Sequence, residues 1–303
     1  MVRVTKNGKC RLGQANGTSS PRNCQDTGTT LAYLKVSIAH ATGQVEMMSR
    51  AGPSWKKILK ILSQEGVVHL TLIDPDPAKQ SSTEAAQIAK LAEAAGTSGI
   101  MVGGSTAFGM LDDSLNQIKA EVDIPVILFP GNVTGLSRFA DAIFFMSLLN
   151  SRTTYWIIDA QTLGARYIKA FDLEPISMGY LIVQPGGTAG FVGDARLIPR
   201  DKPEIALGYA LAAQYMGFQL VYLEAGSGAD NAVPLPMIKL VASKLEIPLA
   251  VGGGINTPSQ AAAVAEAGAD IIVQGTIIER NILRDKGKTL KETIAAIRKA
   301  KKH

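Results

Sequence analysis

The sequence predicts an α/β fold, a (β/α)8 barrel, and three observations carry this prediction. Apolar runs of strand length alternate with amphipathic segments from about residue 55 to the C-terminus. The last three apolar runs each end in glycines and are each followed by a segment with helical spacing. Eight strands within about 250 residues is the usual size of such a barrel. Hydrophobic residues make up 46% of the 303-residue chain, which is enough for one large core.

Residues 1–46 differ in composition from the rest of the chain. Thr, Ser, Asn, Gly and Gln dominate there, without the order of basic and apolar residues that marks a signal peptide. Met47 and Met48 directly precede the first amphipathic pattern and offer an alternative translation start. We expect residues 1–46 to be a disordered or mis-started N-terminal extension, with an ordered extension as the alternative. Residues 47–303 are expected to form the catalytic barrel domain.

The spacing of apolar residues places the elements of the barrel in order. An amphipathic helix over residues 55–62 is expected to cover the bottom of the barrel. Buried parallel strands are expected at residues 67–73, 99–104, 125–129, 142–149 and 179–183. Helices are expected at residues 83–95, 111–121, 154–171 and 202–216. The glycine-rich segment 184–200 is expected to be a binding loop or a lid.

The connection between the third and fourth strands breaks the regular repeat. Little room for a crossover helix remains between Asn132 and Ala142. Because parallel strands normally need a dozen or more residues of crossover, the third helix is expected to be shortened or replaced by a loop.

The stretch from Leu220 to Thr276 supplies the last three strand–helix units. Its strands are expected within residues 220–228, 248–255 and 271–276, with helices from about residues 236, 258 and 277 and a final helix at 290–301. Glycines at the carboxyl ends of strands let backbone N–H groups approach an anion, and a helix N-terminus adds partial positive charge. We therefore expect a phosphate site after strands seven and eight. The alternative is that the glycines only make tight turns.

Polar residues at strand ends are the candidates for an active site, because active sites of this fold lie there. Asp74 and Asp76 follow strand one, Ser105 and Thr106 follow strand two, and Asn132 follows strand three. A carboxylate and a hydroxyl on adjacent strands can hold Mg²⁺, with water and substrate phosphate as the other ligands. The alternative for both aspartates is a turn cap, since Asp-Pro pairs start turns readily.

Glu224 is the sharpest candidate, because it lies between Leu223 and Ala225 in a strand that is expected to be buried. An unpaired buried carboxylate is costly, so Glu224 faces either a partner charge or the active site. We favour a catalytic or substrate-binding role for it. His69, within strand one, is interpreted as a packed core residue, and Trp156 as a core or subunit contact.

Charge and composition argue against several classes of protein. The net charge of +5 is spread along the chain, with a basic cluster only near the C-terminus, and does not indicate nucleic-acid binding. Cys10 and Cys24 have no neighbouring histidines and indicate neither a zinc site nor a disulfide framework. No apolar run of about 18 residues predicts a membrane span. We expect a soluble, cytoplasmic protein.

Six segments stand in a fixed order along the chain. They are HLTLIDPD from His69, VGGST from Val102, YLIVQPG from Tyr180, YLEAGSG from Tyr222, VGGGI from Val251 and QGT from Gln274. As an ordered set they resemble the geranylgeranylglyceryl phosphate synthase family, over roughly residue 55 to the C-terminus. The resemblance implies a modified (β/α)8 TIM barrel with the third helix replaced by a loop. That expectation agrees with the short crossover after Asn132.

The resemblance also implies a function. The family consists of magnesium-dependent prenyltransferases that join sn-glycerol 1-phosphate to geranylgeranyl diphosphate, forming the first ether bond of archaeal membrane lipids and releasing diphosphate. By position, Asp74 and Ser105 would hold Mg²⁺. Glu224 would take the proton from the attacking glycerol hydroxyl, or only orient the glycerol. The glycerol phosphate would lie against Tyr222, Leu223, Glu224, Ala225, Gly226, Ser227 and Gly228, with its phosphate on Gly253, Gly254, Gly275 and Thr276.

The resemblance further implies a homo-oligomer, a dimer or a hexamer, and at most peripheral contact with a membrane. Two other hypotheses stay open. The first is another phosphate-binding barrel enzyme, an isomerase or lyase of amino-acid or cofactor biosynthesis, which would need neither the Asp74–Ser105 pair nor an apolar groove. The second is a non-catalytic barrel, against which Glu224 and the complete glycine set argue. The length of the prenyl chain is left open.

Overall fold

The computed structural model describes residues 3–4, 10–11, 51–104 and 111–301. The chain divides into two units, residues 1–43 and residues 44–303. In the first unit, β1 (Arg3–Val4) pairs antiparallel with β2 (Cys10–Arg11). The rest of the predicted extension lies outside the described residues, so the expectation for residues 1–46 stays a prediction.

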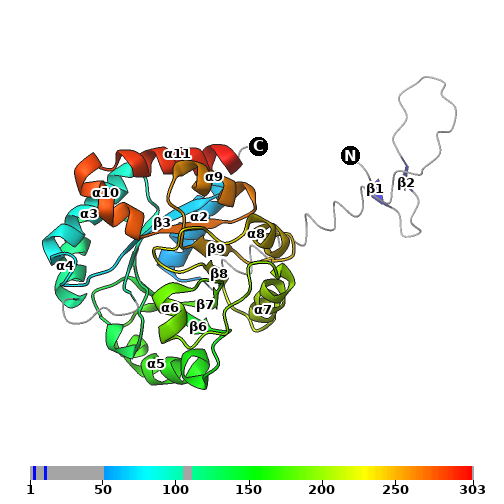
Figure 1. Ribbon diagram of the computed structural model, residues 1–303, viewed down its shortest axis with the longest axis horizontal. Coiled ribbons are helices and arrows are strands. Elements are labelled where there is room, and N and C mark those ends of the chain that lie inside the picture. Colours follow the sequence, from blue (N-terminus) through cyan, green and yellow to red (C-terminus); the bar gives the residue numbers. More distant parts are fainter. Residues whose placement is uncertain (1–2, 5–9, 12–50, 105–110, 302–303) are drawn as a thin grey trace. The chain divides into compact units, whose positions relative to one another are not determined.

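Eight parallel strands close into a barrel in the second unit (Figure 1). They are β3 (Val68–Ile73), β4 (Gly99–Val102), β5 (Val126–Leu128), β6 (Ala142–Leu148), β7 (Glu174–Ile182), β8 (Leu220–Glu224), β9 (Leu249–Gly252) and β10 (Ile271–Gln274). Each strand pairs with its neighbour in chain order, and β10 returns to β3 with Ile271 opposite Val68. The predicted fold class is confirmed.

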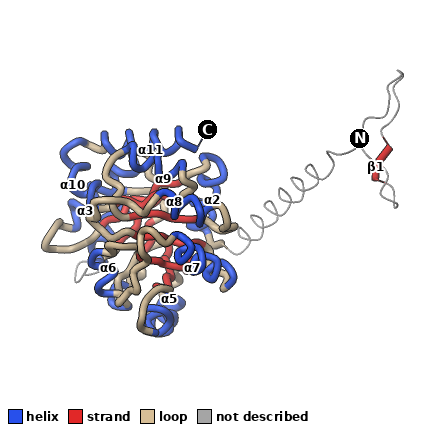
Figure 2. Tube along the Cα trace, turned by 45° about the vertical axis from the view of Figure 1, so that its right-hand side comes forward, coloured by secondary structure: helices blue, strands red, loops and turns tan. Residues whose placement is uncertain are grey.

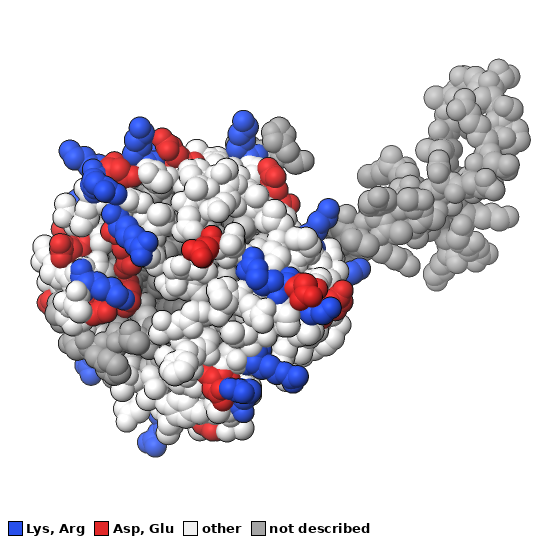
Figure 3. Space-filling model, in the orientation of Figure 1, with Lys and Arg blue, Asp and Glu red and all other residues white. Residues whose placement is uncertain are grey.

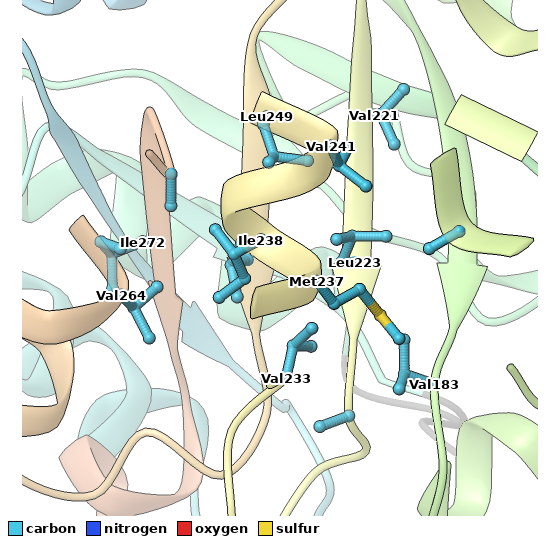
Figure 4. Close-up of a cluster of buried hydrophobic side chains, with 14 of the residues drawn as sticks. Val183, Val221, Leu223, Val233, Met237, Ile238, Val241, Leu249, Val264 and Ile272 are labelled. Atoms are coloured by element: carbon cyan, nitrogen blue, oxygen red, sulfur yellow. The ribbon is translucent and has the colours of Figure 1, made fainter. Parts of the chain in front are cut away.

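Helices form a layer around the strands (Figures 1 and 2). They are α3 (Ser82–Ala95), α4 (Leu111–Glu121), α5 (Ala160–Ala170), α7 (Pro203–Tyr215), α8 (Leu235–Ala242), α9 (Pro258–Glu266), α10 (Thr276–Asp285) and α11 (Lys288–Lys301). Outward-facing strand residues pack under this layer, as where Met237 and Val241 of α8 cover Leu223 of β8 (Figure 4). Because side chains alternate along a strand, Tyr222 and Glu224 on either side of Leu223 point into the barrel.

The inside of the barrel is filled by bulky side chains. Leu70, Met101, Ile127, Phe144 and Met178, from five different strands, belong to one buried cluster. This cluster is a packed core, as the barrel fold requires, and not an open channel.

The helix α2 (Pro53–Glu65) closes the end of the barrel opposite the active-site end. Trp55 and Ile58 are fully buried and belong to the inner cluster. The carboxylate of Glu174 at the start of β7 accepts the N–H groups of Ser54 at 2.6 Å and Trp55 at 3.0 Å. These bonds satisfy donors that a helix N-terminus leaves free. The helix expected at the bottom of the barrel is therefore in place.

No full helix stands between β5 and β6. The connection carries only the 3₁₀ turn η1 (Val133–Gly135), which Asn132 caps by accepting the N–H of Val133 at 2.7 Å. The predicted replacement of the third helix is observed.

Three local expectations differ in detail from the structure. β7 begins at Glu174 rather than at residue 179, because Pro175 weakens the strand pattern at its start. The short helix α6 (Gly187–Val192) lies in the segment expected to be a loop, and its two glycines conceal it. The helix expected at 154–171 begins with the π-helical turn η2 (Tyr155–Asp159) and continues as α5.

Within the described ranges, no helix is both long and apolar enough to cross a bilayer. On the face shown in Figure 3, Lys and Arg are interspersed with Asp and Glu.

Candidate active site

Glu224 ends β8 with its side chain inside the barrel, 6% exposed. Tyr222 Oη donates to Glu224 Oε2 at 2.7 Å, and the Gly226 N–H donates to Oε1 at 2.6 Å. Burial raises the pKa of Glu224, and the two hydrogen bonds oppose that rise. Its hydrogen-bond partners are a neutral hydroxyl and a backbone amide. Of the two expectations for this buried carboxylate, the active-site role therefore fits better than a partner charge.

Three aromatic rings pack against one another, and one of them belongs to Tyr222, the hydrogen-bond partner of Glu224. The ring centroids of Tyr180 and Tyr222 are 5.2 Å apart, and Phe129 lies 5.6 Å from Tyr180 and 5.9 Å from Tyr222. Tyr222 lines a pocket rich in glycine, whereas Tyr180 and Phe129 line a larger apolar cavity. The contact between Tyr222 and Tyr180 therefore joins the walls of the two compartments, and Glu224 is hydrogen bonded to the ring on the side of the glycine pocket.

The first compartment, here called the glycine pocket, brings together most of the predicted substrate residues. Its walls include Tyr222, Glu224, Ser227, Gly228, Gly253, Gly254, Gly275 and Thr276. Ser227 Oγ and Thr276 Oγ1 are hydrogen bonded at 2.9 Å across the pocket mouth. Thr276 is the first residue of α10, so the N-terminus of a ten-residue helix opens here. Such an N-terminus favours an anion.

Two different structural reasons explain why glycine occupies these positions of the pocket. Gly253 and Gly254 have φ of +76° and +67°, a region that favours glycine. A Cβ at Gly253 would also lie 2.7 Å from the Gly226 nitrogen. Gly275 has φ of −125°, which other residues also adopt, and a Cβ there would lie 3.3 Å from Leu72. Among the described residues, no hydrogen bond engages the N–H groups of Gly253, Gly254 or Gly275.

Two predicted substrate residues face away from the glycine pocket. Leu223 and Ala225 are fully buried in the cluster between the strands and the outer helices. The strand alternation that points Glu224 inward points these side chains outward. A substrate in the glycine pocket has only their backbone to contact.

Asp74 lies just beyond β3, at the same end of the barrel. Its Oδ2 is 2.5 Å from Lys79 Nζ, whereas its Oδ1 is buried and has no hydrogen-bond partner in the described part of the chain. A Cβ on Gly104 would collide with this carboxylate, so the backbone after β4 approaches Asp74 closely. The other predicted metal ligand, Ser105, lies outside the described residues.

Asp76 caps a turn, which is the alternative that the sequence left open for both aspartates. Its carboxylate accepts the Ala78 N–H at 2.9 Å and so caps its own turn, and this bond lowers the pKa of Asp76. Lys79 Nζ also lies 3.3 Å from Asp76, and its hydrogen bond with Asp74 raises the pKa of Lys79.

A magnesium ion fits the donor set at Asp74. A buried carboxylate oxygen without a partner is a position that a cation can fill. No group of three or more His, Cys, Asp or Glu suited to a metal occurs within the described ranges. Magnesium does not require one, because it commonly binds through one or two carboxylates, substrate phosphates and water.

The second compartment, here called the apolar cavity, lies between β5, β6, β7, α5 and α6. Its empty volume is about 820 Å³, including its open mouth. Its walls include Phe129, Val133, Leu136, Phe144, Met146, Leu148, Trp156, Ala160, Gly164, Ile168, Tyr180, Ala189 and Val192. Trp156, interpreted from the sequence as a core or subunit contact, thus lines a cavity.

His69 lies in the core, as expected. It is 1% exposed, with Nδ1 2.9 Å from Thr97 Oγ1 and Nε2 3.1 Å from Gln274 Oε1. Burial lowers its pKa to about 4. The His69 imidazole is therefore uncharged and connects Thr97 and Gln274 by hydrogen bonds within the core.

Sequence reasoning assigned no site role to Tyr180, Lys79 or Glu279. Lys79 had a local signal, since it follows Asp76 by three residues in a turn. Glu279 had none, because its contact with the Asp74 N–H, at 2.8 Å, joins residues 205 positions apart.

Comparison with known proteins gives a consistent result. The model of the PcrB family matches residues 59–297. Over 219 residues the chain is 53% identical to the geranylgeranylglyceryl phosphate synthase of Methanothermobacter thermautotrophicus, covering 72% of this chain and 89% of that protein. Over 243 residues it is 53% identical to the synthase of Methanosarcina barkeri, covering 79% and 97%.

Solved structures agree with these relatives. The crystal structure of (S)-3-O-geranylgeranylglyceryl phosphate synthase from Thermoplasma acidophilum, in complex with its substrate sn-glycerol-1-phosphate, matches with a TM-score of 0.76. It is 46% identical to this chain and covers 80% of this chain and 98% of that one. The similarity therefore includes both the sequence and the whole barrel.

Proposed function

The chain belongs to the PcrB family, together with the geranylgeranylglyceryl phosphate synthases, and from that premise we propose that it is a magnesium-dependent phosphoglycerol geranylgeranyltransferase. It would join sn-glycerol 1-phosphate to geranylgeranyl diphosphate, giving 3-O-geranylgeranyl-sn-glyceryl 1-phosphate and diphosphate. One observation carries the proposal. A buried carboxylate, Glu224, lines the glycine pocket and is hydrogen bonded to Tyr222, whose ring packs against Tyr180 in the wall of the apolar cavity.

The two compartments suit the two substrates. The free N–H groups of Gly253, Gly254 and Gly275 and the N-terminus of α10 would bind the glycerol phosphate. The prenyl chain would lie in the apolar cavity, where its burial removes apolar surface from water. An isomerase or lyase of amino-acid or cofactor biosynthesis would have no use for such a cavity, and this observation favours the prenyltransferase.

Glu224 is the proposed base. In the reaction, the glycerol C3 oxygen bonds to prenyl C1, the bond from C1 to the diphosphate oxygen breaks, and the hydroxyl proton passes to a Glu224 oxygen. A raised pKa makes the carboxylate a better proton acceptor. Tyr222 and Gly226 hold its two oxygens in place, which fixes their direction toward the glycerol.

Asp74 would hold the magnesium ion, with Ser105 as the second predicted ligand. When bound there, the ion neutralises the charge of the diphosphate and makes it a better leaving group. The buried Asp74 oxygen without a partner supports this assignment.

One assay tests the function. The protein is incubated with radiolabelled sn-glycerol 1-phosphate, magnesium and a series of prenyl diphosphates, and the organic phase is counted. We expect label in the organic phase, with geranylgeranyl diphosphate as the preferred donor. No transfer of label with any donor would overturn the proposal.

We also propose a homo-oligomer, a dimer or a hexamer. Ile158, Leu163 and Tyr167, on η2 and α5, are each more than half exposed, which is unusual for large apolar side chains on a free surface. Sedimentation should give a mass that is a multiple of the 32.0 kDa chain, and a monomer at micromolar concentration would contradict this assignment.

A further inference from the structure

Glu279 contacts the backbone of Asp74. It is a half-buried residue in the first half of α10, after the last strand of the barrel. Its Oε1 accepts the Asp74 N–H at 2.8 Å and the side-chain amide of Gln80 at 3.1 Å. Gln80 in turn donates to the Asp74 carbonyl at 2.7 Å. The Asp74 backbone is therefore held at its N–H and at its C=O by two side chains.

The contact acts on the position of Asp74 and not on its carboxylate. The Asp74 carboxylate is paired with Lys79, at 2.5 Å. A second carboxylate nearby is electrostatically unfavourable. Glu279 nevertheless bonds to the Asp74 N–H and to the Gln80 amide rather than to the Asp74 side chain, which indicates that these hydrogen bonds set where Asp74 lies.

The same helix begins in the glycine pocket. Gly275 precedes α10 and Thr276 opens it, while Glu279 lies three residues further along. The N–H groups of Ile278 and Glu279 donate to the Gly275 carbonyl at 2.8 and 3.1 Å, so the first turn is one rigid unit. An anion bound at Gly275 and Thr276 would fix the position of this turn, and with it the position of the Glu279 side chain.

We propose that Glu279 is a positioning residue that couples the two substrate sites. With phosphate in the glycine pocket, α10 holds Glu279 in place, and Glu279 then holds Asp74 where it binds a divalent cation together with diphosphate. The inference rests on the proposed function, which supplies both ligands. Because coupling between two binding equilibria is reciprocal, each ligand must tighten the other by the same factor.

Calorimetry on the full-length protein measures this coupling without turnover. Magnesium with inorganic diphosphate is titrated in the absence and in the presence of saturating sn-glycerol 1-phosphate. For the unmodified protein, glycerol 1-phosphate should tighten diphosphate binding at least about 5-fold, the lower end of typical coupling.

Two substitutions separate the effect of the position of the Glu279 side chain from the effect of its charge. Glu279→Gln keeps the length of the side chain and an acceptor oxygen but removes the charge. Glu279→Asp keeps the charge but shortens the reach to the Asp74 N–H. We expect Glu279→Gln to retain the coupling and Glu279→Asp to reduce it to less than about 2-fold. Glycerol 1-phosphate binding alone should change little in either variant. Glu292→Asp, at an exposed glutamate of α11, is the matched control and should retain the coupling.

The outcomes distinguish this inference from the proposed function. If the unmodified protein turns over both substrates but shows no coupling, only the role of Glu279 is overturned. The same holds if Glu279→Asp keeps the coupling or Glu279→Gln loses it. If the unmodified protein binds no glycerol 1-phosphate, the proposed function and the role of Glu279 both fail.

Discussion

The glycine pocket and the apolar cavity adjoin at the Tyr222–Tyr180 pair, yet they are built from different parts of the chain. The glycine pocket includes four glycines and the start of helix α10, whose backbone N–H groups are the proposed phosphate donors. The apolar cavity presents side chains from β5, β6, β7, α5 and α6. A site made of backbone depends on glycine and on loop geometry, whereas a site made of side chains depends on their size. Substitutions in the two compartments should therefore change substrate binding in different ways.

The largest effect is expected at Asp74, the proposed magnesium ligand, which lies just beyond β3. Asp74→Ala should reduce turnover below detection, because the proposed metal ligand is lost. The thermal midpoint should stay near that of the unmodified protein, since no core volume is removed. Product formation across a magnesium series tests this prediction. Full activity in the variant, or without magnesium, would contradict the metal assignment.

Glu224→Gln should lower kcat by about 10²–10⁴-fold, the usual contribution of a positioned base. The shape of the side chain is kept, so binding of glycerol 1-phosphate should weaken less. Because the carboxylate must be ionised to accept the proton and its pKa is raised above 4.5, the unmodified rate should fall on acidification through that raised pKa.

Single-turnover rates across pH give the measurement. The glutamine variant should be slow and independent of pH. If it instead keeps kcat within a few-fold and loses mainly in KM, Glu224 only orients the glycerol.

Gly275→Val tests the backbone compartment. A branched side chain would press on Leu72, 3.3 Å from the Cβ position, and displace the start of α10. Loss of one or two hydrogen bonds to a charged phosphate should raise KM for glycerol 1-phosphate by about 10–100-fold. KM for the prenyl diphosphate should change little. Gly275→Ala is the milder companion variant, and equal weakening of both substrates would indicate general misfolding.

Gly164→Leu is the counterpart in the apolar cavity. Gly164 lies on α5 in the cavity wall, and a Cβ there meets only Leu136 and Val133, at 3.5 and 4.0 Å. The larger side chain would take up space meant for the prenyl chain. We expect an increase of about 10-fold in KM for geranylgeranyl diphosphate, smaller for shorter donors, with KM for glycerol 1-phosphate unchanged. An increase for glycerol 1-phosphate alone would disprove the assignment of the two compartments.

The smallest effect is expected for Thr276→Ala. The Thr276 hydroxyl is hydrogen bonded to Ser227 at 2.9 Å, whereas its N–H opens α10. If the backbone carries the phosphate, loss of the hydroxyl should cost about one neutral hydrogen bond, or roughly a 5-fold increase in KM for glycerol 1-phosphate. A loss as large as that of Gly275→Val would show that side chains dominate the pocket after all.

The barrel could be predicted because most of its strands are short, largely apolar runs, many with glycine or proline nearby. Where that signal weakens, as at Pro175 in β7 or in the glycine-containing α6, the boundaries were missed. Long-range contacts were also missed. Glu174 caps the N-terminus of α2 by accepting the N–H of Ser54, 120 residues away, and no local sequence pattern records such a contact.

The two compartments also differ in how far the sequence predicts them. Gly253, Gly254 and Gly275 could be predicted to come together, because the fold places successive strand ends side by side, and their role in binding phosphate stays a proposal. The apolar cavity could not, since Trp156, Gly164 and Tyr180 are residue types that also fill ordinary cores. The contact between Glu279 and Asp74 was equally hidden, because only barrel closure brings the last helix to the first strand.

The positive φ at Gly253, together with the close approach of Gly226, has a consequence for how such a protein can change over generations. The glycine pocket offers single substitutions little to adjust at Gly253 and Gly254, because a side chain there would clash with neighbouring backbone and require an unfavourable φ. The cavity wall offers many, since each apolar residue can be exchanged for a larger or smaller one at modest cost. Descendants of this chain can therefore vary the length of the hydrocarbon they accept by single steps. A different polar headgroup would require rebuilding whole loops.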